Sequence, residues 1–182
     1  MPRLTASRSG GVRKINRRPS RLLANGLPWL SILLASLLPG WLVIASAPVV
    51  PPLAFLMFVG WRQVRPGLMP MWAGIPLGLF DDLFSGQPFG SAVFLWSLAA
   101  IALDFVETRL PWRNFFTEWL VAVGLIILYI GMSLALANLA GASAPISAIV
   151  PQIVISVLSY PLVGRLVALA DRFRLTPFVD LR

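Results

Sequence analysis

The chain has 182 residues, of which 58% are hydrophobic and only 12% are charged, whereas a soluble domain usually carries about 25% charged residues. One small core cannot bury so much apolar surface, so the composition predicts an all-α membrane protein. The absence of cysteine and histidine excludes disulfides, thiolate nucleophiles and the usual zinc and copper sites, and it argues against most enzymes. The net charge of +8 lies in an N-terminal tail and in short gaps between apolar segments, which argues against nucleic-acid binding.

The N-terminal part divides into a basic tail and a first apolar segment. Residues 1–26 are basic and rich in Ser, Pro and Gly, so we expect a disordered cytoplasmic tail. Residues 27–47 predict a membrane helix with a kink near Pro39. A signal peptide cleaved after Ala47 is the rival interpretation. It is disfavoured because the segment exceeds the usual core of about 7–15 residues and because Pro48 follows directly.

Five further apolar segments follow, at residues 48–61, 67–80, 90–105, 115–139 and 146–169. The second and third segments of the chain are short for a bilayer that needs about 20 helical residues, and both contain prolines. The sequence therefore predicts a bundle of six transmembrane helices over residues 27–170. Five helices are the alternative, if residues 48–80 form a re-entrant hairpin. Residues 171–182 are expected to form a short cytoplasmic tail.

The basic residues indicate the orientation of this bundle. If the N-terminus is cytoplasmic and six helices alternate, all fifteen basic residues fall on the cytoplasmic side. They lie in the tail, around Arg62 and Arg65, around Arg109 and Arg113, and in the C-terminal segment. The gaps assigned to the outer side contain none. This asymmetry predicts a chain with both termini in the cytoplasm.

Two adjacent carboxylates, Asp81 and Asp82, stand where the third apolar segment ends. They either face water at the end of the helix or lie below the interface, where each needs a partner. In the following loop, Gly86 and Gly90 permit backbone conformations that other residues avoid, and Pro88 stiffens the chain. We expect Asp82 to be structural or partner-binding, and to anchor the loop that precedes the fourth helix.

Small residues on the third and fourth helices predict faces that pack against other helices of the protein. Gly74 and Gly78 form a G-x-x-x-G pair that permits close approach of another helix. A small and polar stripe runs along one face of the fourth helix, at Ser97, Ala100, Asp104 and Glu107. Asp104 is expected either to pair with Arg62, Arg65 or Arg109 or to reach water. Because Asp82 is assigned to the outer face of the membrane and Asp104 to a position near the inner face, an aspartyl protease dyad is disfavoured.

The stretch GLFDDLFSGQPFG, residues 78–90, resembles the signature of MreD, the rod shape-determining membrane protein of bacteria. Gly78 matches the leading glycine of that signature, Asp82 its aspartate, and Gly86 and Gly90 its two later glycines. Asp81 stands where the family shows an apolar or variable residue. Chain length and the six apolar segments agree with the family, whereas the long basic tail departs from its shorter members.

The resemblance implies a non-enzymatic subunit of the rod complex, or elongasome, in the bacterial cytoplasmic (inner) membrane, with no cofactor and no metal. Its implied partners are MreC above all, then MreB, RodA and a class B penicillin-binding transpeptidase. The basic tail could also attract anionic lipid. The family fold is thought to be similar to the S components of energy-coupling-factor vitamin transporters. A small-molecule-binding transporter subunit is therefore the alternative function.

Overall fold

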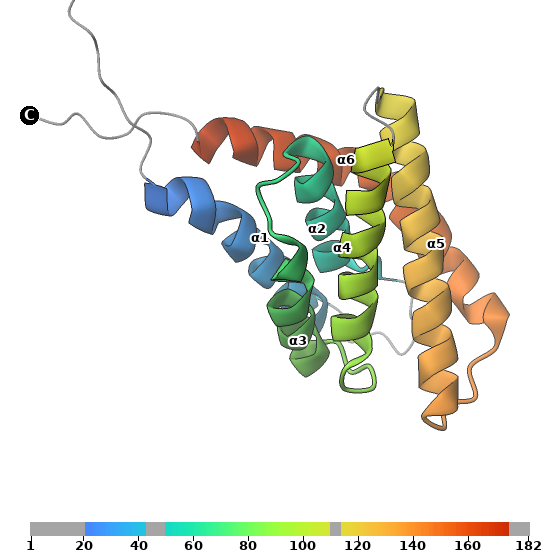
Figure 1. The fold of residues 1–182 in the computed structure, drawn as a ribbon. Helices are drawn as coiled ribbons and strands as arrows, with labels where there is room; N and C mark the ends of the chain where they lie inside the picture. The colour runs from blue at the N-terminus through green and yellow to red at the C-terminus, as the bar shows by residue number, and fades with distance from the viewer. Residues whose placement is uncertain (1–20, 43–49, 110–113, 175–182) are drawn as a thin grey trace, which may run out of the picture.

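A computed structural model describes residues 21–42, 50–109 and 114–174, and every regular element within these ranges is a helix (Figure 1). The α-helices are α1 (Arg21–Leu42), α2 (Leu53–Val64), α3 (Gly74–Phe84), α4 (Ser91–Arg109), α5 (Phe115–Leu139) and α6 (Val150–Arg174). Two short 3₁₀ helices, η1 (Met71–Ala73) and η2 (Ile146–Ile149), lead directly into α3 and α6.

The helices form a bundle around α2. This helix contacts α1, α4, α5 and α6, and nine of its twelve residues are buried. A helix with apolar side chains on all sides is usually buried in the core of a protein. The centre of this core contains the fully buried Phe55, Phe58 and Trp61 of α2 together with Trp96 of α4. The helix α4 lies between α3 and α5, and α6 crosses the bundle obliquely towards α1 (Figure 1).

The predicted all-helical class is confirmed for the described residues, and three helices among them are long and apolar enough to cross a membrane. These are α4, α5 and the continuous stretch from η2 through α6, Ile146–Arg174. Their outward faces remain apolar: Leu158, Leu162, Leu166 and Leu169 follow one side of α6 and are all exposed. Such a continuous exposed stripe is typical of a helix surrounded by lipid.

The second and third segments form short helices, in line with their interruption by proline. At about 1.5 Å per residue, the twelve residues of α2 extend only about 18 Å, against about 30 Å for a hydrocarbon core. Pro51 and Pro52 immediately precede α2, and Pro70 immediately precedes η1. Burial inside the bundle, rather than lipid contact, accounts for the apolar character of α2.

Several observed helix boundaries differ from the expected ones, including the start of α2 at Leu53 and of α3 at Gly74. The first helix begins at Arg21, inside the predicted tail, because helix-forming leucines and alanine precede Pro28. The third helix continues to Phe84, so Asp81 and Asp82 lie within its last turn. The sixth helix continues to Arg174, inside the segment predicted as a C-terminal tail. The expected tail over residues 1–20, the proposed cleavage stretch and residues 175–182 lie outside the described residues.

Candidate functional site

Polar side chains concentrate at the two opposite ends of the bundle. At the aspartate end α3 ends and α4 begins, and this end contains Asp81 and Asp82. At the arginine end α2 and α6 end, and this end contains Arg62, Arg65 and Arg174. Both ends contain buried charged groups, so each needs a structural or functional explanation.

At the aspartate end, the carboxylate of Asp82 binds the first turn of α4. It accepts hydrogen bonds from the backbone N–H groups of Gly90 (2.9 Å), Ala92 (2.8 Å) and Val93 (3.3 Å). The Ser91 hydroxyl donates a fourth hydrogen bond at 3.3 Å. The first N–H groups of a helix have no partner within the helix, and their dipoles favour a negative charge. Asp82 of α3 therefore caps a different helix, α4.

The loop between these helices turns on two glycines. Gly86 has φ +68° and Gly90 has φ +91°, a region of backbone conformation that side chains with a Cβ rarely adopt. The Ser91 N–H then donates to the Pro88 carbonyl at 3.0 Å, which closes the turn in front of α4. These conformations place the start of α4 within reach of Asp82.

Glycines also set the distance between α3 and α4. A Cβ added to Gly74 would lie 2.8 Å from the backbone of Trp96, and one added to Gly78 would lie 2.8 Å from the backbone of Ala92. Real Cβ atoms essentially never make contacts this short with backbone. The two helices therefore touch along the face that these glycines share, and the hairpin is fixed by this contact and by the Asp82 cap.

The neighbouring Asp81 has a different environment, although it is equally buried. It faces a cavity of about 480 Å³ whose walls come from α1, α2, α3, α5 and the approach to α6. Ser36, Gln87 and Tyr129 also line this cavity, and all three lie close to Asp81 or to one another. Of the two adjacent carboxylates, Asp82 therefore caps α4 and Asp81 forms part of the cavity wall.

The stripe expected on α4 is only partly buried. Ala100 is fully buried, whereas Asp104 and Glu107 are partly exposed. The Ser97 hydroxyl donates to the Val93 carbonyl of its own helix at 2.7 Å. Asp104 lies 3.7 Å from the guanidinium of Arg62 while about half of its side chain stays exposed. It thus both pairs with an arginine and reaches the surface.

The last residues of α2 connect this helix to each of its neighbours, a role that the sequence reasoning missed. The buried Arg62 donates through Nη1 to the Met69 carbonyl at 2.9 Å and through Nη2 to the Ala100 carbonyl of α4 at 3.3 Å. Gln63 donates to the Glu118 carbonyl of α5 at 3.0 Å and accepts from the Tyr160 hydroxyl of α6 at 2.6 Å. The available signal was a pair of polar side chains in the last turn of an otherwise apolar helix.

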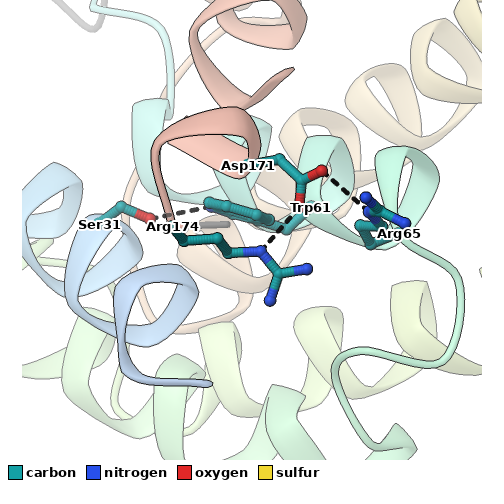
Figure 2. Close-up of polar contacts among 5 residues, drawn as sticks. All are labelled: Ser31, Trp61, Arg65, Asp171 and Arg174. Carbon is teal, nitrogen blue, oxygen red and sulfur yellow. Dashed lines mark hydrogen bonds and ion pairs between the residues drawn. The ribbon is translucent and has the colours of Figure 1, made fainter. Parts of the chain in front are cut away.

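Figure 2 shows the rest of this network, between α1, α2 and α6. The Asp171 carboxylate accepts from Nε of Arg65 at 2.9 Å and from Nε of Arg174 at 2.7 Å. The Arg174 guanidinium lies 5.8 Å from the ring centroid of Trp61, whose Nε1 donates to the Ser31 hydroxyl at 2.9 Å. Trp61 is fully buried. The network holds the arginine end together.

The described parts of the chain contain no group of three or more carboxylate side chains that could hold a metal ion. Most buried polar groups of the described residues bind other parts of the chain, and the exceptions are the side chains of Ser36, Trp96 and Ser133. Over its described residues the chain is all-helical, and three of these helices are long and apolar enough to cross a membrane. Comparison with known proteins finds no matching family model, no matching curated protein and no matching solved structure.

Proposed function

We propose that this protein is a non-enzymatic, multi-pass subunit of the bacterial elongasome, with the MreD-like role of binding MreC and supporting lateral peptidoglycan synthesis. The observation that carries the proposal is the construction of residues 78–90. The four residues that match the MreD signature, Gly78, Asp82, Gly86 and Gly90, all act on one feature, the junction of α3 with α4. A signature whose members build one rigid hairpin fits a subunit that presents a fixed surface to partners.

The proposed location is the cytoplasmic membrane, with all six helices in one membrane domain and both termini in the cytoplasm. Three helices have the length and apolar character to cross a membrane unaided. The shorter α2 is enclosed by the others and therefore needs no lipid-facing length of its own. The arginine end would then be cytoplasmic, in agreement with the usual excess of basic residues on that side.

The end of the hairpin offers a surface for a partner helix. Leu83, Phe84, Phe89 and Phe94 are exposed around the Asp82 cap, and Phe89 is 73% exposed. Aromatic side chains are enriched where proteins bind each other, because they bury a large area at a small entropic cost. We assign the contact with MreC and its associated wall enzymes to this surface.

The test is co-purification of the full chain with tagged MreC from membranes. Asp82→Ala should reduce the recovered complex strongly, whereas Asp81→Ala, one residue away, should leave it intact. Since Asp82→Ala also weakens the fold, Phe89→Ala is the second variant: this exposed side chain contributes little to stability, yet its loss should reduce binding. Depletion of the protein should turn rods into spheres. Unchanged cell shape together with no recovered MreC would refute the proposal.

The second candidate function is a small-molecule-binding subunit, similar to the S components of vitamin transporters. The cavity beside Asp81 favours it, since its volume of about 480 Å³ is that of a ligand site. This function predicts a ligand retained by the purified protein and an uptake defect on deletion. Native mass spectrometry without any ligand, together with normal uptake, would exclude it.

A further inference from the structure

The cavity at the aspartate end is built from segments far apart in the sequence. Its walls include the last turns of α1 and α3, the first turn of α2, the second half of α5 and the residues around η2. Most of the lining is apolar, with Phe55, Ile130 and Leu134 as examples. Known ligand sites span about 300–1,000 Å³ and are largely apolar with a few polar groups, and this cavity of about 480 Å³ matches both features.

Three polar groups in or beside this cavity lack a hydrogen-bond partner among the described residues, whereas Gln152, which also lines it, donates to the Val50 carbonyl. Ser36 is 5% exposed, and its hydroxyl lies near Asp81 without completing a hydrogen bond to any described residue. The Ser133 hydroxyl and the Trp96 indole N–H are also buried without a partner among the described residues. Ser36 and Ser133 line the cavity, and Trp96 lies next to Tyr129, which also lines it. Buried polar groups normally have hydrogen-bond partners, so three exceptions in or beside one cavity indicate that a bound ligand supplies the missing partners.

The charge of the cavity is negative and uncompensated. Among the described residues, its lining includes the Asp81 carboxylate and no arginine or lysine. The adjacent Asp82 is also buried, but four donors and the N-terminus of α4 stabilise its charge. No comparable set of donors surrounds Asp81. A carboxylate in an apolar site is costly unless a cation or several hydrogen-bond donors accompany it.

The aromatic, hydroxyl and apolar groups of the lining indicate the chemical class of a cation that could accompany Asp81. Phe55 and Tyr129 stack with ring centroids 4.1 Å apart, and both rings line the cavity. Aromatic rings attract cations, and serine hydroxyls accept hydrogen bonds from N–H groups. The apolar part of the lining suits a hydrocarbon chain. The required ligand therefore combines an ammonium group with an apolar body.

We propose that this cavity binds the ammonium group of a small amphipathic amine, with Asp81 as its counter-ion and Ser36 and Ser133 as hydrogen-bond acceptors. The ammonium could come from a free amine or from the headgroup of an aminophospholipid, because both share this chemistry. The site adjoins the hairpin surface assigned to MreC at Phe84, which lines the cavity, whereas Phe89 does not. Binding does not depend on the proposed role in the elongasome.

The experiment uses the full chain purified in detergent, with hexylamine as the probe. Thermal unfolding is followed during titration with hexylamine and, separately, with hexanol, which has the same chain length without the charge. Asp81→Asn is the test variant. Asp104→Asn is the matched control, because it makes the same change at the opposite end of the bundle. A ligand that binds only the folded state raises the unfolding temperature with its concentration.

Hexylamine should stabilise the original protein and Asp104→Asn, hexanol should have little effect, and Asp81→Asn should bind at least about tenfold more weakly. Equal stabilisation by hexylamine and hexanol, or equal binding by Asp81→Asn, would overturn the proposal. If Asp81→Asn does not fold, Ser133→Leu replaces it, since this variant fills the cavity from α5 and leaves the carboxylate in place. Undiminished hexylamine binding by Ser133→Leu would overturn the proposal equally.

A second arm distinguishes the two sources of the ammonium group. The protein is reconstituted into nanodiscs of phosphatidylglycerol with or without phosphatidylethanolamine, and retained lipid is identified by native mass spectrometry. Phosphatidylethanolamine retained by the original protein but not by Asp81→Asn identifies the lipid headgroup as the ligand. Hexylamine binding without retained phosphatidylethanolamine identifies a free amine. Loss of MreC binding in Phe89→Ala with hexylamine binding intact would separate this inference from the proposed function.

Discussion

Replacing Asp82 by alanine removes the carboxylate that joins α3 to the first turn of α4. Two of its hydrogen bonds are short, from Ala92 N–H at 2.8 Å and Gly90 N–H at 2.9 Å, and two are longer, at 3.3 Å. A hydrogen bond to a charged group contributes about 1.5–3 kcal/mol, and loss of a helix N-cap costs about 0.5–2 kcal/mol. The two short hydrogen bonds therefore determine most of the expected destabilisation. Removal of the buried charge offsets part of it, because the desolvation cost of the carboxylate is lost as well.

We therefore expect Asp82→Ala to lower the free energy of unfolding by about 3 kcal/mol. Asp82→Asn, which keeps one carbonyl oxygen as an acceptor, should lose about half as much. Asp81→Ala is the matched control, because it removes the same group one residue earlier without touching the α4 cap. Its effect should stay within about 1 kcal/mol and should tend towards stabilisation, since an uncompensated buried carboxylate disappears.

The assay is reversible unfolding in mixed micelles, with helix content followed by circular dichroism as the fraction of denaturing detergent rises. Amide hydrogen exchange at Ala92 and Val93 adds a local readout, because these N–H groups lose their acceptor. Exchange should accelerate there in Asp82→Ala and not in Asp81→Ala. If the two alanine variants unfold at the same detergent fraction, the reasoning that Asp82 caps α4 is refuted.

Two further substitutions test the packing of the bundle by the same assay. Gly78→Ala should destabilise the protein by about 1–3 kcal/mol, because its Cβ would meet the Ala92 backbone at 2.8 Å. Gly124→Ala, where nothing lies within 4 Å, should change stability by no more than about 1 kcal/mol, and equal effects would contradict close α3–α4 packing. Asp171→Asn should lower the free energy of unfolding by about 2–3 kcal/mol, because it breaks two ion pairs. The control Arg172→Gln, at an exposed position, should leave stability almost unchanged. An Asp171→Asn variant as stable as the original protein would show that this network contributes little.

The sequence alone determined the class of structure, because apolar composition and segment length are properties of the chain itself. The fifth helix occupies the predicted residues, since nothing interrupts its apolar run, and the long sixth segment is also helical. The signature loop could be predicted because residue type acts locally on the backbone: proline restricts φ, and glycine permits the positive φ that Gly86 and Gly90 adopt. The assignments to the elongasome and to MreC remain predictions.

Only the tertiary structure decided which groups each polar residue meets. The sequence predicted that Asp82 anchors the loop before the fourth helix, but it did not predict the surroundings of Asp81. The two side chains leave the helix in different directions, so Asp82 meets the N-terminus of α4 and Asp81 meets a cavity. Arg65 is likewise indistinguishable from a topology signal until α6 places Asp171 beside it, 106 residues later. Partners of this kind depend on how helices cross in space, and hydrophobic periodicity along a single segment contains no information about that crossing.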